Sequence, residues 1–441
     1  MSAGSEGPCD VSFPRSHRRA RAAGNERALL WPVTQNKVET RPVGPVRRVL
    51  AGMVTGSSDV DPALVVTATV AGAVCHYSLL WTVLLAVPFL LAVFAVSARI
   101  GFETRHGLVD LLRGRYGRAA ALGCAAIIAT INMAMIVADL MAVTDSFSIL
   151  LQLPRMFFIA AVTFSLWYVL IFRDYRKITN ALALLSLPLF IYVAAAVLAQ
   201  PDWRQVISQS VFPRIPHSPG YPAAIIAVFG CLLTPYVVVW QTATRREDAL
   251  AGAGPWGRTE HRAGTVVTTV LCFFIMAAAG TVLHVRSVEG MTTRMAAAAL
   301  APAVGDLATL VFAVSIIGAG MVALPILVAS MCYSVAEAVG WRSGLGENPW
   351  EAVRFYALIS GAIFVAAVLN FIRINAVVAL YWSQILAGIL AVPILALILL
   401  ISNDRAIMRT ANTWWQNFWI GAAIGAIFAA GTLALWWRVA G

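Results

Sequence analysis

Eleven long apolar runs, separated by short polar segments, constrain this chain more than any other feature. As a helix, each run is long enough to cross about 30 Å of hydrocarbon. The runs lie at roughly residues 50–73, 77–98, 119–147, 156–173, 180–200, 222–244, 264–285, 306–339, 353–371, 374–402 and 417–437. Of the 441 residues, 60% are apolar and only 12% are charged, against roughly a quarter charged in soluble domains. We therefore predict an all-α polytopic membrane protein.

The basic residues indicate how these spans are oriented. With the N-terminus in the cytoplasm, the cytoplasmic segments hold 25 Lys and Arg residues and the opposite side holds 7. Cytoplasmic loops of membrane proteins carry such an excess, so the net charge of +11 does not indicate nucleic-acid binding. We expect residues 46–441 to form one transmembrane domain that ends outside. Residues 1–45 lack a signal-peptide run and are predicted to be a disordered basic cytoplasmic tail.

Cysteine spacing and short motifs exclude several classes of function. Six cysteines are scattered along the chain, and no CxxC or Cys/His spacing indicates zinc or a disulfide framework. The sequence contains no GxxxxGK[ST] or HExxH motif, nor a Ser/His/Asp arrangement. We therefore expect neither an enzyme nor a bound cofactor. His284, near the outer end of the seventh span, is unremarkable as an interfacial histidine.

The first span contains a carboxylate and a proline near its middle. Asp61 lies about ten residues past the start of the span, which is roughly 15 Å into the membrane at 1.5 Å per residue. A carboxylate at that depth is costly unless it faces a polar cavity or a partner. Pro62 removes one helix hydrogen bond and disfavours helical geometry at Asp61. Pro62 could cause only a kink without a functional role. Alternatively, it could unwind a segment of the span that binds a cation.

The sixth span carries a matching interruption, which favours the functional explanation. It reads FGCLLTPYVVVWQT, with Pro235 near mid-membrane after Cys231 and Thr234. Spans one and six are each the first span of one half in an arrangement of two repeats of five spans. Paired interrupted spans in corresponding positions point to an inverted-repeat transporter and its substrate site. We predict eleven transmembrane helices in such a fold, with helices 1 and 6 broken at Pro62 and Pro235.

Further polar side chains lie within the third and tenth spans. Asp139 has no cationic partner nearby in sequence, and either relays protons or lines a wet vestibule. Asn132, seven residues earlier, lies on the same helical face and would line the same passage. Gln384 follows Ser383 in the tenth span, where a side-chain amide is often only a contact between helices.

These residues, taken in order, resemble the motifs of the NRAMP (natural resistance-associated macrophage protein) family of divalent-metal transporters. The first-span motif of the family, DPGN, reads DPAL at 61–64 and is followed by a threonine at 67. The sixth-span TPYVVVWQT and the segments 318–341 and 374–400 are similar to further family patterns. The extra acidic residue, Asp59, resembles the bacterial NRAMP-related branch that includes magnesium transporters.

The resemblance implies an eleven-span inverted-repeat fold, shared with sodium-coupled amino-acid symporters, that moves metal by alternating access. By position it implies a metal site of Asp61, Thr234, Gln384 and Cys231, the last through its carbonyl, to which we add Asp59 as a candidate second carboxylate. Asp139 matches an aspartate of the proton route. Gln241 and Tyr236 stand where classical members have histidines linked to proton coupling, which predicts weak or absent coupling here.

Two departures from the family motifs concern the metal. Thr234 replaces a methionine, so a soft sulfur ligand gives way to a hydroxyl, as Mg²⁺ prefers. Leu64 replaces an asparagine ligand and coordinates nothing. Either Asp59 supplies a second carboxylate instead, or tight metal binding has been lost.

The sequence thus predicts a secondary transporter of Mg²⁺ or Mn²⁺ in a bacterial inner membrane. Its partners would be the metal ion and membrane lipid, without nucleic acid. Two alternatives stay open: a carrier of a small organic amine that pairs with Asp61, and a transport-inactive sensor or scaffold, for which Leu64 is the best argument.

Overall fold

The computed structural model describes residues 60–172, 187–216, 218, 220–250, 258–285, 287–346, 348–372 and 374–440. The predicted N-terminal tail and Asp59 lie outside these ranges. The elements assigned within the ranges are α-helices and short 3-10 helices, without a strand.

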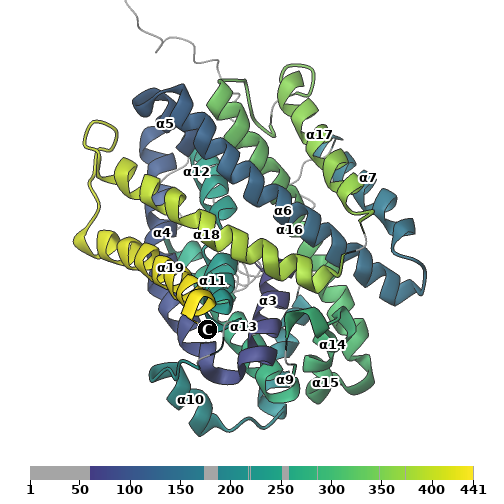
Figure 1. The fold of residues 1–441 in the computed structure, drawn as a ribbon. Coiled ribbons are helices and arrows are strands. Elements are labelled where there is room, and N and C mark those ends of the chain that lie inside the picture. The colour runs from purple at the N-terminus through teal and green to yellow at the C-terminus, as the bar shows by residue number, and fades with distance from the viewer. Residues whose placement is uncertain are drawn as a thin grey trace, which may run out of the picture. The chain divides into compact units, whose positions relative to one another are not determined.

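The helices follow the predicted spans in order (Figure 1). The first half contains α3 (Pro62–Cys75), α4 (Leu80–Thr104), α5 (Leu108–Tyr116), α6 (Arg118–Leu151), α7 (Met156–Phe172), α9 (Ile191–Leu198) and α10 (Trp203–Val211). The second half contains α11 (Gly220–Leu232), α12 (Pro235–Leu250), α13 (Arg258–Val282), α14 (Thr293–Ala297), α15 (Ala301–Val304), α16 (Ala308–Val339), α17 (Val353–Leu369), α18 (Ala376–Asn403) and α19 (Trp414–Ala440). Each of the eleven predicted spans overlaps at least one of these helices.

Within the described ranges, seven helical stretches are long and apolar enough to cross a membrane. They are Pro62–Thr104, Arg118–Leu151, Gly220–Arg246, Gly264–Val282, Thr293–Val339, Ala376–Asn403 and Trp414–Trp437. The first stretch holds both α3 and α4. Three shorter apolar helices, Met156–Phe172, Leu187–Leu198 and Val353–Leu369, coincide with predicted spans four, five and nine. The all-helical membrane fold is therefore as predicted, and the number of membrane crossings stays a prediction.

Glycines let helices cross at very short backbone distances. A Cβ placed on Gly230 of α11 would lie 2.0 Å from the carbonyl oxygen of Gln384 on α18, and one on Gly388 would lie 2.5 Å from the carbonyl oxygen of Ile226. A Cβ on Gly72 of α3 would lie 2.3 Å from the carbonyl oxygen of Met276 on α13. Because lipid gives helices no hydrophobic reason to associate, small residues at such crossings supply the packing.

Helix α3 lies in the interior of the helical domain. Every residue from Pro62 to Ala73 is buried, as expected for a helix that is apolar on all sides. It packs against α13, α18, α11 and α6, which surround it in Figure 1. The first-span segment that carries Asp61 is therefore enclosed by protein and does not face lipid.

Candidate functional site

Asp61 is the N-cap residue of α3. Its backbone is extended (φ −90°, ψ 167°), and its Oδ1 accepts a hydrogen bond from the backbone N–H of Leu64 at 2.7 Å. Pro62 occupies the first helical position, where no intrahelical donor is needed. The helix therefore begins at Pro62 for local reasons, and its start carries a buried carboxylate.

The second oxygen of this carboxylate contacts the sixth span. The hydroxyl of Tyr236 donates to Oδ2 of Asp61 at 3.2 Å. Helix α11 ends at Leu232 and α12 begins at Pro235, so Leu233 and Thr234 form a non-helical connector. The sixth-span interruption and the start of α3 thus meet at the Asp61–Tyr236 hydrogen bond.

Pro235 frees a carbonyl in this connector. In a continuous helix, the carbonyl of Cys231 would accept from the N–H of residue 235, and proline has none. The thiol of Cys231 is engaged within its own helix, where Sγ donates to the carbonyl oxygen of Val228 at 3.2 Å. The group of Cys231 that the break leaves available is therefore its carbonyl oxygen.

Thr234 and Cys231 line a small pocket behind the connector. Its walls come from α4, the connector with its flanking residues, and α13: Leu90, Phe94, Cys231, Leu232, Thr234, Val237, Thr265 and Thr268. Asp61 does not line this pocket. Two of the predicted metal-site residues, Cys231 and Thr234, thus line the same pocket, whereas the Asp61 carboxylate is hydrogen-bonded to Tyr236.

A chain of hydrogen bonds extends from Tyr236 to α6. Ser330 Oγ on α16 donates to the carbonyl oxygen of Tyr236 at 3.1 Å, and Asn132 Nδ2 donates to Ser330 Oγ at 3.3 Å and to the carbonyl oxygen of Leu327 at 3.2 Å. Asn132 is fully buried. It links α6 to α16, and its connection to Asp61 runs through Ser330 and Tyr236.

Several predicted site residues carry buried polar atoms without a hydrogen-bond partner among the described residues. These atoms are both carboxylate oxygens of Asp139, both amide atoms of Gln384, Oε1 of Gln241 and Oδ1 of Asn132. Asp139 lies on α6, which packs against α3. Buried polar groups nearly always have a hydrogen-bond partner. These unpaired atoms are therefore consistent with a protein interior that takes up water or ions during function.

The predicted site residues that the structure describes offer oxygen donors and no cluster of strong metal-binding side chains. In the ranges that the structure covers, no three His, Cys, Asp or Glu side chains gather to hold a metal. Leu64 contributes its backbone N–H to Asp61, while its side chain packs in the core. The donors on offer are one carboxylate, freed carbonyls, hydroxyls and an amide. Oxygen ligands of this kind, completed by water, are those that Mg²⁺ takes.

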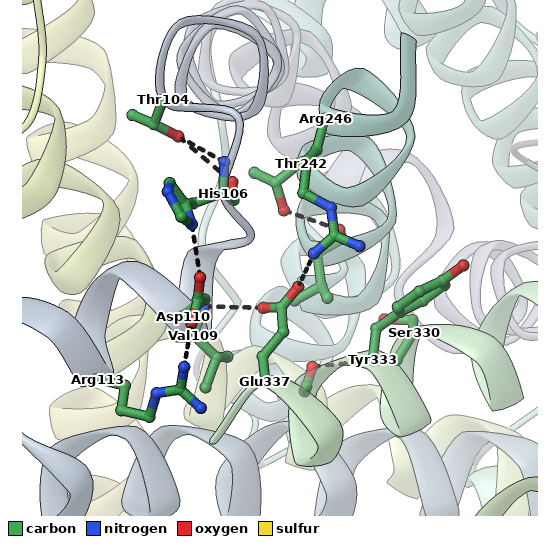
Figure 2. Close-up of polar contacts among 12 residues, drawn as sticks. Thr104, His106, Val109, Asp110, Arg113, Thr242, Arg246, Ser330, Tyr333 and Glu337 are labelled. Atoms are coloured by element: carbon green, nitrogen blue, oxygen red, sulfur yellow. Dashed lines mark hydrogen bonds and ion pairs between the residues drawn. The ribbon is translucent and has the colours of Figure 1, made fainter. Parts of the chain in front are cut away.

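A separate polar cluster joins the ends of α5, α12 and α16 (Figure 2). Glu337 Oε1 forms an ion pair with Arg246 at 3.3 Å, and its Oε2 accepts the backbone N–H of Val109 at 3.3 Å. A Cβ on Gly107 would overlap this carboxylate. The cluster could not be predicted from the sequence, because Arg246 and Glu337 are 91 residues apart and each alone is only a charge near the end of a span.

His106 and Asp110 form the exposed edge of this cluster. Asp110 accepts from His106 Nδ1 at 2.6 Å and from Arg113 at 2.7 Å. Partial burial acts to raise the pKa of Asp110, but the hydrogen bond from His106 and the nearby positive charges outweigh it and lower that pKa. The same hydrogen bond raises the pKa of His106.

The sequence matches a known family along most of its length. Residues 52–437 fit the profile of the family described as natural resistance-associated macrophage protein-like. The chain belongs to this NRAMP family. It is similar to the divalent metal cation transporter MntH of Granulibacter bethesdensis, with 24% identity over 83% of each chain. MntH of Burkholderia ambifaria is 26% identical over 52% of this chain and 51% of its own length.

Solved structures share the fold of this NRAMP protein. The manganese transporter of Eremococcus coleocola, in complex with an aromatic bis-isothiourea compound, superposes with a TM-score of 0.68 at 16% identity, covering 93% of this chain and 99% of the other. MhsT in complex with L-phenylalanine gives a TM-score of 0.51 at 13% identity, covering 89% and 99%. The protein is therefore a multi-pass integral membrane protein with a transporter fold, and not an enzyme.

Proposed function

We propose that this NRAMP protein is a secondary transporter of divalent metal cations that carries Mg²⁺ or Mn²⁺ across a bacterial inner membrane by alternating access. The observation that carries the proposal is the buried Asp61 carboxylate at the start of α3, in contact with Tyr236 beside the sixth-span interruption. The similarity to proteins described as divalent metal cation transporters supports it.

The donor chemistry supports Mg²⁺ or Mn²⁺ over softer metals. Asp61, the freed carbonyl of Cys231 and the hydroxyl of Thr234 all offer oxygen, and Gln384 adds an unpaired buried amide. Metals that favour carboxylate, carbonyl and water include Mg²⁺ and Mn²⁺. Because Asp61 does not line the pocket that contains Thr234, we infer that the two residues close around the ion in another step of the transport cycle.

Uptake into proteoliposomes tests the proposal through two variants of one residue. Asp61→Ala removes both the charge and the helix cap, whereas Asp61→Asn removes the charge and keeps a good cap. Both should lower Mg²⁺ and Mn²⁺ uptake at least about tenfold, since losing even an outer partner of a metal ligand lowers affinity about 10- to 100-fold. Only the alanine variant should also lose roughly 0.5–2 kcal/mol of stability.

Two results would overturn the proposal. Wild-type protein that moves neither ion would refute transport of these metals, and normal uptake by Asp61→Asn would show that the ion binds elsewhere. A thermal shift with a small amine, and none with Mg²⁺ or Mn²⁺, would favour the carrier of an organic amine.

We further propose that metal uptake is weakly coupled or uncoupled to protons. Gln241 and Tyr236 cannot titrate as histidines do near neutral pH, and the Tyr236 hydroxyl is committed to Asp61. A pH-sensitive dye in the vesicle lumen should report no acidification during Mn²⁺ uptake. Clear metal-driven proton influx would show that carboxylates such as Asp139 suffice for coupling.

A further inference from the structure

A pair of histidines joins the ends of α3 and α13 that lie farthest from Asp61. His76 directly follows the last residue of α3, and His284 lies two residues beyond Val282, the last residue of α13. Their ring centroids are 5.2 Å apart, with the ring planes inclined by 58°. Both side chains are exposed. At 1.5 Å per residue along α3, the pair is roughly 20 Å from Asp61.

The hydrogen bond of His76 determines which of its nitrogens can bind a ligand. Nδ1 of His76 lies 3.1 Å from the carbonyl oxygen of Gly280. A carbonyl only accepts, so Nδ1 carries the proton in this hydrogen bond. The neutral ring then keeps a lone pair on Nε2. Metal-binding histidines have this arrangement, in which a backbone carbonyl fixes the ring through its other nitrogen.

The backbone of His76 is also unusual. Its φ of 50° and ψ of −129° lie in a region that non-glycine residues rarely adopt. Glycine is the common residue at the position after a helix, and it would avoid this cost. Residues held in sparsely populated conformations cluster at functional sites, so the strained backbone suggests a functional role for the His76 side chain.

The frame around the pair is rigid. The hydroxyls of Tyr77 and Thr281 are hydrogen-bonded at 2.8 Å, and the N–H of Val285 donates to the carbonyl oxygen of Ala73 at 3.4 Å. Below them, Gly72 lets α3 approach the backbone of α13 closely. These contacts hold the ends of α3 and α13 together, and the His76 ring is fixed further by its hydrogen bond to Gly280.

We propose that His76 and His284 form a binding site for a divalent transition-metal ion such as Zn²⁺, completed by water. With a zinc–nitrogen distance of about 2.0–2.1 Å, each ring centroid would lie about 3.2 Å from the ion, and a tetrahedral angle would separate the centroids by about 5 Å. The observed 5.2 Å fits this geometry. Imidazole suits zinc, copper and nickel, whereas Mg²⁺ prefers oxygen. The pair would therefore select ions other than the proposed cargo.

Calorimetric titration of the full-length, detergent-solubilised protein with Zn²⁺ tests this site. Excess Mg²⁺ is included in the buffer to occupy the oxygen-rich sites. His76→Gln and His284→Gln should each lower the affinity of one Zn²⁺ site at least about tenfold. His106→Gln is the matched control, because His106 pairs with Asp110 in the other cluster, and it should leave that site unchanged.

A further variant separates ligand loss from misfolding. His76→Gly removes the imidazole and its hydrogen bond to Gly280 but relieves the positive φ, so its thermal stability should stay close to that of the wild type while Zn²⁺ binding at this site is lost. Zn²⁺ binding that survives both glutamine substitutions, or a wild type that binds no Zn²⁺ in excess Mg²⁺, would overturn the proposal. An equal loss in His106→Gln would do the same.

Discussion

Leu64 differs from the family motif, but the local structure at the start of α3 does not depend on its side chain. It stands where the family motif has an asparagine, and its backbone N–H donates to Asp61 Oδ1 at 2.7 Å. Any residue except proline can supply that donor, so the cap on α3 survives the replacement. What is lost is a side-chain oxygen beside the carboxylate. Under the proposed metal site, we therefore expect the replacement to lower ion affinity and to leave the helix cap intact.

Thr234 carries a prediction at the same scale. Thr234→Met would place a thioether in the pocket beside Cys231, and sulfur favours Mn²⁺ over Mg²⁺. We expect the ratio of Mn²⁺ to Mg²⁺ uptake to rise in competition experiments with both ions. Thr234→Val, which removes the hydroxyl at similar volume, should lower uptake of both ions. An unchanged ratio in the methionine variant would exclude Thr234 as a selectivity residue.

At the scale of helices, the crossing of α11 and α18 is fixed by Gly230. Gly230→Ala would place a methyl group 2.0 Å from the Gln384 carbonyl oxygen. Forcing the helices apart should cost about 1–3 kcal/mol, visible as a lower unfolding temperature in detergent. Gly123→Ala is the control, because nothing lies within 4 Å of a Cβ on exposed Gly123. It should be neutral or slightly stabilising, and a similar loss in both variants would contradict the packing argument.

The pair Arg246–Glu337 ties α12 to α16, and it is far more enclosed than a second pair in the same protein. The side chains are 17% and 4% exposed, against 51% and 48% for Arg342 and Glu351. Arg246→Met leaves a buried carboxylate without its ion-pair partner, which should cost about 3–5 kcal/mol. Arg342→Met should cost less than about 1 kcal/mol. Chemical unfolding of both variants measures the difference, and equal losses would show that the Arg246 pair is not a buried interaction.

The contact between His106 and Asp110, at the corner between α4 and α5, predicts a pH dependence. Because the pKa of His106 is raised above 6.5, its contribution to stability is complete below that pH and is lost as the pH rises through the folded-state pKa. The lowered pKa of Asp110 has the opposite sense, so its contribution is present above 3.8 and is lost in acid. The stability difference between wild type and His106→Gln should therefore shrink as the pH rises above about 6.5. A difference independent of pH would contradict this assignment.

For the whole molecule, charge asymmetry predicts the orientation in the membrane. The expected cytoplasmic segments hold 25 Lys and Arg residues against 7 on the other side, so residue 441 should lie outside the cytoplasm. A fluorescent protein fused there should stay dark in a bacterial host, and alkaline phosphatase fused there should be active. Fusions after residue 106 should give the reverse pattern. A fluorescent C-terminal fusion would refute the predicted orientation, and with it an odd number of crossings or a cytoplasmic N-terminus.

The sequence by itself determined the membrane-helical class, the start of α3 and the break in the sixth span. In lipid, long apolar runs can form few structures other than helices. A proline interrupts the backbone hydrogen bonds of a helix at its own position, whatever the tertiary structure. Family motifs then identified the transporter fold. Only the tertiary structure decided which side chains meet: Asp61 with Tyr236, Asn132 with Ser330, Arg246 with Glu337 and His76 with His284. These partners lie in different spans, so their contacts depend on how the helices pack. That is why His284, unremarkable in the sequence, became half of a candidate site.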